Sequence, residues 1–88
     1  MIDPRTKLID YLEKKFPEET FTLADGLELA FIGVKKRKKT GKLVACYDRE
    51  ICIALLMEDG ISSYSDALEY FEYNVSDAWV GEETPIFI

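Results

Sequence analysis

The sequence predicts an α+β fold in which helices pack on one face of a mostly antiparallel sheet, in the order α-β-β-β-α-α-β. Three observations predict it. Apolar residues recur at helical spacing near the N-terminus and again in the C-terminal half. Between these two regions, β-forming runs alternate with a turn dipeptide and a basic segment. The last residues of the chain are also apolar. The chain has 88 residues, 48% of them hydrophobic, which suffices for one core and not for two. Residues 1–88 are therefore expected to form a single domain.

The first helix is expected over about residues 4–15. Asp3 is a capping carboxylate, and Pro4 suits the first helical position because its missing N–H has no partner there anyway. Pro17 disfavours helical geometry in the residue before it and ends the helix. The apolar residues at helical spacing are Leu8, Ile9, Leu12 and Phe16.

The middle of the chain predicts three strands. Residues 20–23 and 27–34 flank Asp25-Gly26, a dipeptide typical of tight hairpin turns. Residues 43–47 form the next strand, joined to 27–34 by a basic loop over 35–42. The strand over 27–34 is thus expected to pair on both sides.

Two further helices are expected. Asp48 caps one whose body, Ile51–Met57, is apolar nearly all round and therefore predicted to be buried. Ser63 and Asp66 have the spacing of a capping box and begin the other. The apolar face of that last helix comprises Tyr64, Leu68, Phe71 and Val75.

The C-terminal segment Thr84–Ile88 is too hydrophobic to remain in water. It is expected to add an edge strand, with Pro85 at its start, where a missing N–H is tolerated. An exposed sheet edge also offers a route to a homo-oligomer.

The residue inventory argues against an enzyme. There is no histidine, which removes the commonest general base and metal ligand. Cys46 and Cys52 lie six residues apart without a CxxC or zinc-ligand pattern, so both are expected to be buried thiols, and no cofactor is expected. The longest nearly apolar run, Ile51–Met57, is far below the about 20 residues that span a bilayer. Because the N-terminus also lacks a signal pattern, a cytoplasmic protein without membrane contact is expected.

Carboxylates are numerous enough to suggest metal binding or glycoside hydrolysis. Their positions favour capping of helices or exposure on solvated faces instead, and neither a Gly-rich phosphate loop nor a Ser-centred elbow is present. The candidates considered are Asp48, Glu50, Glu58, Asp59, Glu69 and Glu72.

Charge is distributed unevenly along this chain of net charge −6. Residues 35–42 carry six basic groups and no acidic one, whereas residues 43–88 carry one basic group and ten acidic ones. The basic residues are Lys35, Lys36, Arg37, Lys38, Lys39 and Lys42. At a hairpin tip they would contact nucleic-acid phosphates, bind an acidic protein, or form a solvated loop facing away from the C-terminal half. The nearest aromatics, Phe31 and Tyr47, stand at strand ends and do not predict a base-stacking platform.

A pattern of residue types extends over the C-terminal half, from Val44 to Phe87. It comprises Tyr47-Asp48, Cys52-Ile53, Leu56, Asp59-Gly60, Ala67, Glu69-Tyr70-Phe71, Asn74-Val75, Ala78-Trp79-Val80-Gly81-Glu82 and Thr84-Pro85-Ile86-Phe87. This pattern resembles a group of small uncharacterised phage and prophage proteins. It covers about half of the chain and leaves out the basic run. The resemblance implies an accessory protein of a mobile element and brings no catalytic residues with it.

The same half contains the candidate protein-interface residues, because aromatic side chains with polar groups are favoured at protein interfaces. They are Tyr70, Tyr73, Asn74, Trp79 and Glu82. Filling of the core is the alternative role for Trp79 and for Phe71. The sequence thus favours a non-catalytic protein-binding or inhibitor module, whose acidic surface could occupy a basic site on a host protein. The alternative is a nucleic-acid-binding protein that uses the basic hairpin.

Overall fold

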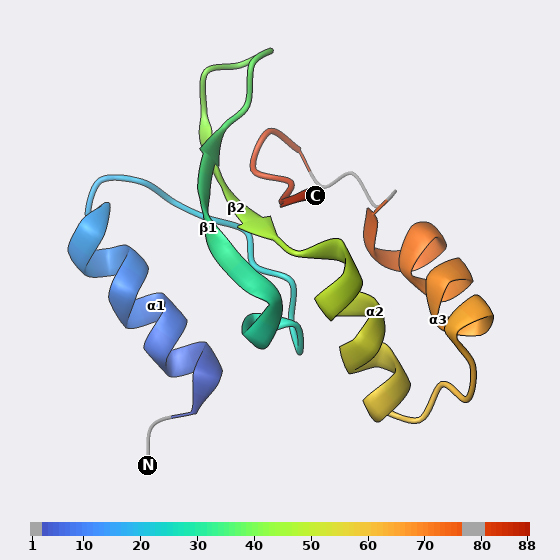
Figure 1. Ribbon diagram of the computed structural model, residues 1–88. Helices are drawn as coiled ribbons and strands as arrows, with labels where there is room; N and C mark the ends of the chain where they lie inside the picture. Colours follow the sequence, from blue (N-terminus) through green and yellow to red (C-terminus); the bar gives the residue numbers. More distant parts are fainter. Residues whose placement is uncertain (1–2, 77–80) are drawn as a thin grey trace.

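The computed structural model describes residues 3–76 and 81–88, and Figure 1 shows their arrangement. Helix α1 spans Pro4–Lys15, as the sequence predicts. The Asp3 carboxylate accepts hydrogen bonds from the Thr6 backbone N–H at 2.9 Å and from the Thr6 hydroxyl at 3.0 Å. These bonds favour the ionised form and lower the pKa of the Asp3 carboxyl. The expected cap therefore begins the helix.

The sheet contains the strands β1 (Phe31–Lys36), β2 (Leu43–Tyr47) and β3 (Ile86–Phe87). Their order is β1-β2-β3, with β1 antiparallel to β2 and β3 parallel to it. The basic loop joins β1 to β2, and the C-terminal segment adds an edge strand after Pro85, both as predicted. The α+β class is confirmed, with a mixed three-stranded sheet in which β2 is central.

The hairpin predicted over residues 20–34 does not form. Asp25 and Gly26 do make a turn, in which the Leu27 N–H donates to the Ala24 carbonyl at 3.1 Å, but only Gly26 has a positive φ, +83°. The tight turns that hairpins favour most require positive φ at both central residues or at the first. The chain instead enters the single 3-10 turn η1 (Glu28–Ala30), and residues 20–23 stay irregular. Among the strands of residues 3–76 and 81–88, β2 alone pairs on both sides.

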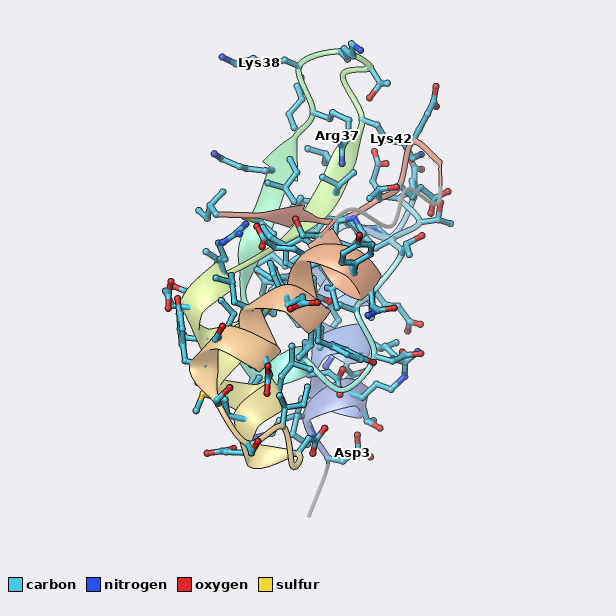
Figure 2. The ribbon with its side chains drawn as sticks, turned by 90° about the vertical axis from the view of Figure 1, so that its right-hand side faces the viewer. Asp3, Arg37, Lys38 and Lys42 are labelled. Atoms are coloured by element: carbon cyan, nitrogen blue, oxygen red, sulfur yellow. The ribbon has the colours of Figure 1, made fainter. Side chains whose placement is uncertain are left out.

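Helices cover the strands from two sides and not from one. Figures 1 and 2 place α1 on one side of the strands and α3 on the other, together with α2. The physical reason lies in β2, where the four consecutive residues 44–47 are each at most 3% exposed. Because successive side chains of a strand point to opposite faces, burial of all four requires cover on both.

Helix α2 (Arg49–Glu58) and helix α3 (Tyr64–Phe71) begin at the predicted caps. The Ile51 N–H donates to the Asp48 carboxylate at 2.9 Å, and the Asp66 N–H donates to the Ser63 hydroxyl at 3.1 Å. A π-helical turn, η2 (Glu72–Ser76), extends α3. The prediction that α2 is buried nearly all round is wrong, since Ile51 and Met57 are exposed and only one side of the helix enters the core.

Aromatic rings connect the three strands to α3. Tyr47 lies beside Phe31 on β1, with ring centroids 5.8 Å apart, and stacks on Phe87 of β3 at 5.5 Å. Phe87 in turn meets Phe71 edge to face at 5.2 Å. Tyr47 and Phe71 are fully buried, so this row of rings forms the centre of the core.

Both cysteines are buried free thiols, as expected. Burial, assisted by the Asp48 carboxylate, raises the pKa of Cys52 to about 12. The thiol therefore remains protonated in neutral solution and acts as a core residue. Within residues 3–76 and 81–88, no helix combines the length and the apolar character needed to cross a membrane.

Candidate protein-binding surface

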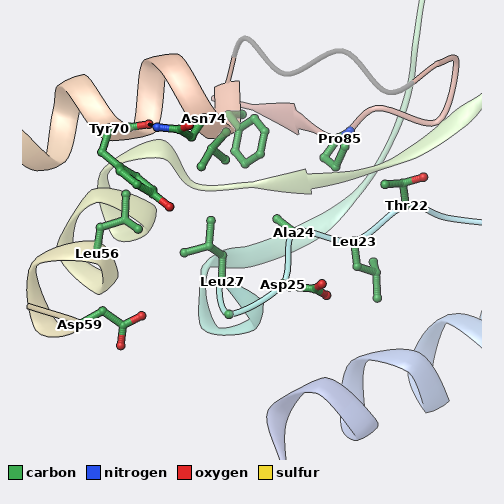
Figure 3. A pocket seen from close by; sticks show the side chains of 13 residues that line it. Thr22, Leu23, Ala24, Asp25, Leu27, Leu56, Asp59, Tyr70, Asn74 and Pro85 are labelled. Carbon is green, nitrogen blue, oxygen red and sulfur yellow. Dashed lines mark hydrogen bonds between the residues drawn. The ribbon is translucent and has the colours of Figure 1, made fainter.

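A cavity of about 370 Å³ opens beside Tyr70, between the irregular segment and the last two helices (Figure 3). We call it the Tyr70 pocket. Residues 22–27 form one wall, Leu56 of α2 and the following cap residue Asp59 contribute the next, and β3 with the preceding Pro85 closes one end. Tyr70, Asn74 and Val75 complete the lining. The pocket thus combines an apolar interior with carboxylates from Asp25 and Asp59.

Tyr70 presents its ring to this pocket from the last turn of α3. Its side chain is 47% exposed, and in Figure 3 it points from the helix toward the wall formed by residues 22–27. The side-chain amide of Asn74 donates to the Tyr70 backbone carbonyl at 3.2 Å. The hydrogen bond holds the backbone at Tyr70, and a tyrosine ring has only two rotatable side-chain bonds, so contact with a ligand costs little conformational entropy.

The wall opposite Tyr70 is held by a buried side chain of the sheet. The Tyr47 hydroxyl accepts a hydrogen bond from the Ala24 N–H at 3.0 Å, and burial raises the pKa of this phenol. An ion pair between Arg5 and Asp25 connects the same segment to α1. An irregular backbone is therefore fixed in place by two contacts that are distant in sequence.

A second hollow, of about 320 Å³, adjoins the Tyr70 pocket on the outer side of α3. We call it the acidic hollow. It shares Tyr70 and Asn74 with the pocket and adds Asp66, Glu69 and the 79% exposed Tyr73. Among the described residues, no lysine or arginine lines either cavity. Tyr70 thus stands between two cavities that both carry carboxylates.

The basic loop forms a short, structured hairpin tip. Backbone hydrogen bonds continue past β1 and β2, from the Arg37 N–H to the Lys42 carbonyl at 2.8 Å and from the Gly41 N–H to the Arg37 carbonyl at 2.7 Å. Only residues 38–40 lie beyond these bonds, and we call them the basic tip. Figure 2 shows Lys38 pointing away from the rest of the molecule.

The basic loop contacts the C-terminal segment, contrary to the expectation that it faces away from that half. The Arg37 guanidinium donates to the Thr84 carbonyl. Glu82 lines a hollow of about 490 Å³ together with Arg37 and the basic tip. Glu82 therefore lies with the basic loop and not with Tyr70, whereas Phe31 and Tyr47 occupy the opposite end of the β1–β2 ladder. Lys35, Lys36, Lys38 and Lys39 are exposed, and Arg37 and Lys42 are partly buried.

The structure thus brings together three of the five predicted interface residues, Tyr70, Tyr73 and Asn74. Glu82 is separated from them, and Trp79 lies outside the described residues. Sequence reasoning missed the wall formed by residues 22–27, because that segment looked like a strand. It also missed Leu56 as a pocket residue and took Asp59 only for the polar end of a helix. No local signal identifies these residues, since a pocket wall depends on contacts between distant segments.

Several carboxylates considered as catalytic candidates have structural partners. Asp48 caps α2, Glu50 accepts a hydrogen bond from the Tyr64 hydroxyl at 3.0 Å, and Glu72 pairs with Arg49 at 3.2 Å. The bond to Glu50 raises the pKa of Tyr64. In the part of the chain that is described, no three His, Cys, Asp or Glu side chains are grouped so as to hold a metal ion.

Comparison with known proteins identifies no relative of this chain. No family model, no curated protein and no solved structure matches it. Functional inference therefore rests on the pocket, the acidic hollow and the basic tip themselves.

Proposed function

We propose that the protein is a non-catalytic binding module whose Tyr70 pocket takes a basic side chain from an extended segment of a partner protein. The observation that supports this proposal is the composition of the pocket. Leu23, Leu27 and Leu56 supply an apolar interior, and Asp59 supplies negative charge, whereas the charge of Asp25 is already paired with Arg5. A lysine or arginine has the matching form, with an apolar stem and a cationic end. The Tyr70 ring adds a face over which a cation binds favourably.

The electrostatic surroundings support a basic partner. Asp59, Asp66 and Glu69 are exposed and form no ion pair among the described residues. Complementary charge steers association and excludes acidic competitors. A role as a cytoplasmic accessory or inhibitor protein of a phage or prophage belongs to the same proposal, and its only support is the resemblance of the C-terminal half.

A peptide titration tests this function. The probe is a short fluorescent peptide of alternating lysine and glycine, here called the lysine peptide, and the control replaces each lysine by glutamate. We expect fluorescence anisotropy to rise with the lysine peptide alone, and the affinity to fall when salt is raised from about 20 to about 300 mM. Equal binding of both peptides, or binding of neither, would contradict the proposal.

Nucleic-acid binding through the basic loop is the second candidate, because four exposed lysines cluster on one projecting hairpin. Two observations weigh against it. Glu82 lies beside the tip, and the nearest aromatic residues of the hairpin lie at its far end. If this function holds, DNA or RNA binds at about 50 mM salt and the triple variant K36E/K38E/K39E abolishes binding. Lack of binding by the unmodified protein at that salt concentration would remove this candidate.

A further inference from the structure

The basic tip and the acidic cavities lie on different parts of one chain and have complementary chemistry. The tip carries Lys38 and Lys39, both exposed, and the cavities on either side of Tyr70 carry carboxylates without a basic residue in their described linings. Every copy of the protein therefore presents both a basic projection and an acidic receptor. We propose that the protein self-associates head to tail, with the basic tip of one copy seated at the Tyr70 pocket of a second copy.

The tip cannot reach the pocket of its own chain. Backbone hydrogen bonds at Arg37 and Gly41 close the hairpin, so only residues 38–40 are outside the ladder. Both views show this hairpin projecting away from α2, which forms part of the pocket. A second contact, from Arg37 to the Thr84 carbonyl, holds the base of the loop against the C-terminal segment. Docking must therefore occur between molecules.

The tip is also ordered before it binds. The Thr40 hydroxyl accepts a hydrogen bond from the Lys42 N–H at 3.2 Å, which adds to the backbone bonds that order the turn. Because the tip is ordered before binding, docking loses less conformational entropy than the capture of a flexible segment. A lysine stem can pack in the apolar interior while its ammonium group approaches Asp59 or the Tyr70 ring.

This contact joins two different surfaces, so it leaves a free tip and a free pocket after each addition. Such a heterologous interface extends into a chain unless its rotation closes a ring. Its attraction is largely electrostatic and weakens as salt screens the charges. The inference rests on the proposed function, because it uses the same pocket and the same ligand chemistry, and it adds the identity of one partner.

Charge reversal in two separate variants provides the test. One variant reverses the tip (K38E/K39E), and the other reverses the receptor (D59K/E69K). All four positions are exposed, and circular dichroism checks that each variant remains folded. In sedimentation velocity at about 20 mM salt, we expect the average mass of the unmodified protein to rise with concentration and each variant to remain monomeric.

The decisive sample is the equimolar mixture of the two variants. The receptor variant retains its lysine tip and the tip variant retains its acidic receptor, so the mixture is expected to associate where neither variant does so alone. A monomeric unmodified protein at every concentration, self-association of either variant alone, or a monomeric mixture would overturn the inference. Binding of the lysine peptide to the tip variant, measured in parallel, shows whether the proposed function survives such a result. If that variant binds the peptide while the mixture stays monomeric, only self-association fails.

Discussion

The basic tip and the Tyr70 pocket differ in how they are built and in how visible they are in the sequence. The tip consists of contiguous residues at the end of a two-stranded ladder, and its charge is evident from composition alone. The pocket combines residues 22–27 with α2, α3 and β3, and its walls depend on the buried rings of the core. A prominent charge run therefore indicates a surface, whereas a cavity that can select a ligand requires the whole fold. The following predictions test this contrast, beginning with the largest effect.

The pocket should depend on the core, and the tip should not. Phe71 is fully buried against Phe87, so Phe71→Ala is expected to lower the free energy of unfolding by about 3–5 kcal/mol. Lys38→Ala, at an exposed position, should change it by less than about 0.5 kcal/mol. Urea unfolding measures both. Similar losses for the two variants would show that the tip is part of the cooperative core.

Binding should depend on the position of a tyrosine and not simply on its exposure. Tyr70→Ala is expected to weaken binding of the lysine peptide by about tenfold, because a partly exposed aromatic side chain is a typical interface anchor. Tyr11→Ala is the matched control, since Tyr11 is 44% exposed, against 47% for Tyr70, and lies on α1. Anisotropy titrations compare the two variants. An equal loss in both, or no loss in Tyr70→Ala, would remove Tyr70 from the binding site.

Some elements of the fold depend on local sequence and others on contacts between distant residues. The cap at Asp3, the helix over residues 4–15 and the hairpin that carries the basic loop follow from local signals, and all three are confirmed. The turn at Asp25-Gly26 is local too, but the position of the chain that leads into it depends on Tyr47, which lies 23 residues from its hydrogen-bond partner Ala24. Local signals therefore predict Tyr70 and Asn74 as site residues but do not predict the wall formed by residues 22–27.

Tyr47 should position the pocket wall through its hydroxyl. Tyr47→Phe retains the buried ring but leaves the partly buried Ala24 N–H without its acceptor. We expect a loss of about 1 kcal/mol in the free energy of unfolding and a weaker affinity for the lysine peptide. Ser63→Ala is the control that separates positioning of the wall from general destabilisation of the protein. It should cost a similar amount, about 1 kcal/mol, by removing a helix cap, and leave peptide affinity unchanged.

The last effect is confined to alkaline pH, outside the range of the other measurements. Because the pKa of Cys52 is about 12 in the folded protein, against an ordinary value of 9.0, the unfolded chain releases this proton first. The contribution to stability is fully present below about pH 9 and declines as pH rises from there toward 12. Urea unfolding over this range should show a shallower decline for Cys52→Ala. An identical pH dependence in the variant would mean that Cys52 titrates normally in the core.

The most direct test of the central claim is to locate the lysine peptide on the protein by amide proton–nitrogen NMR. If the Tyr70 pocket is the binding site, then in a sample dilute enough to be monomeric the largest shift changes fall on Ala24, Leu27 and Asn74, while the amides of residues 38–40 remain unchanged. Shift changes concentrated at the basic tip, or spread evenly over the exposed carboxylates with none at Ala24 and Leu27, would contradict the account.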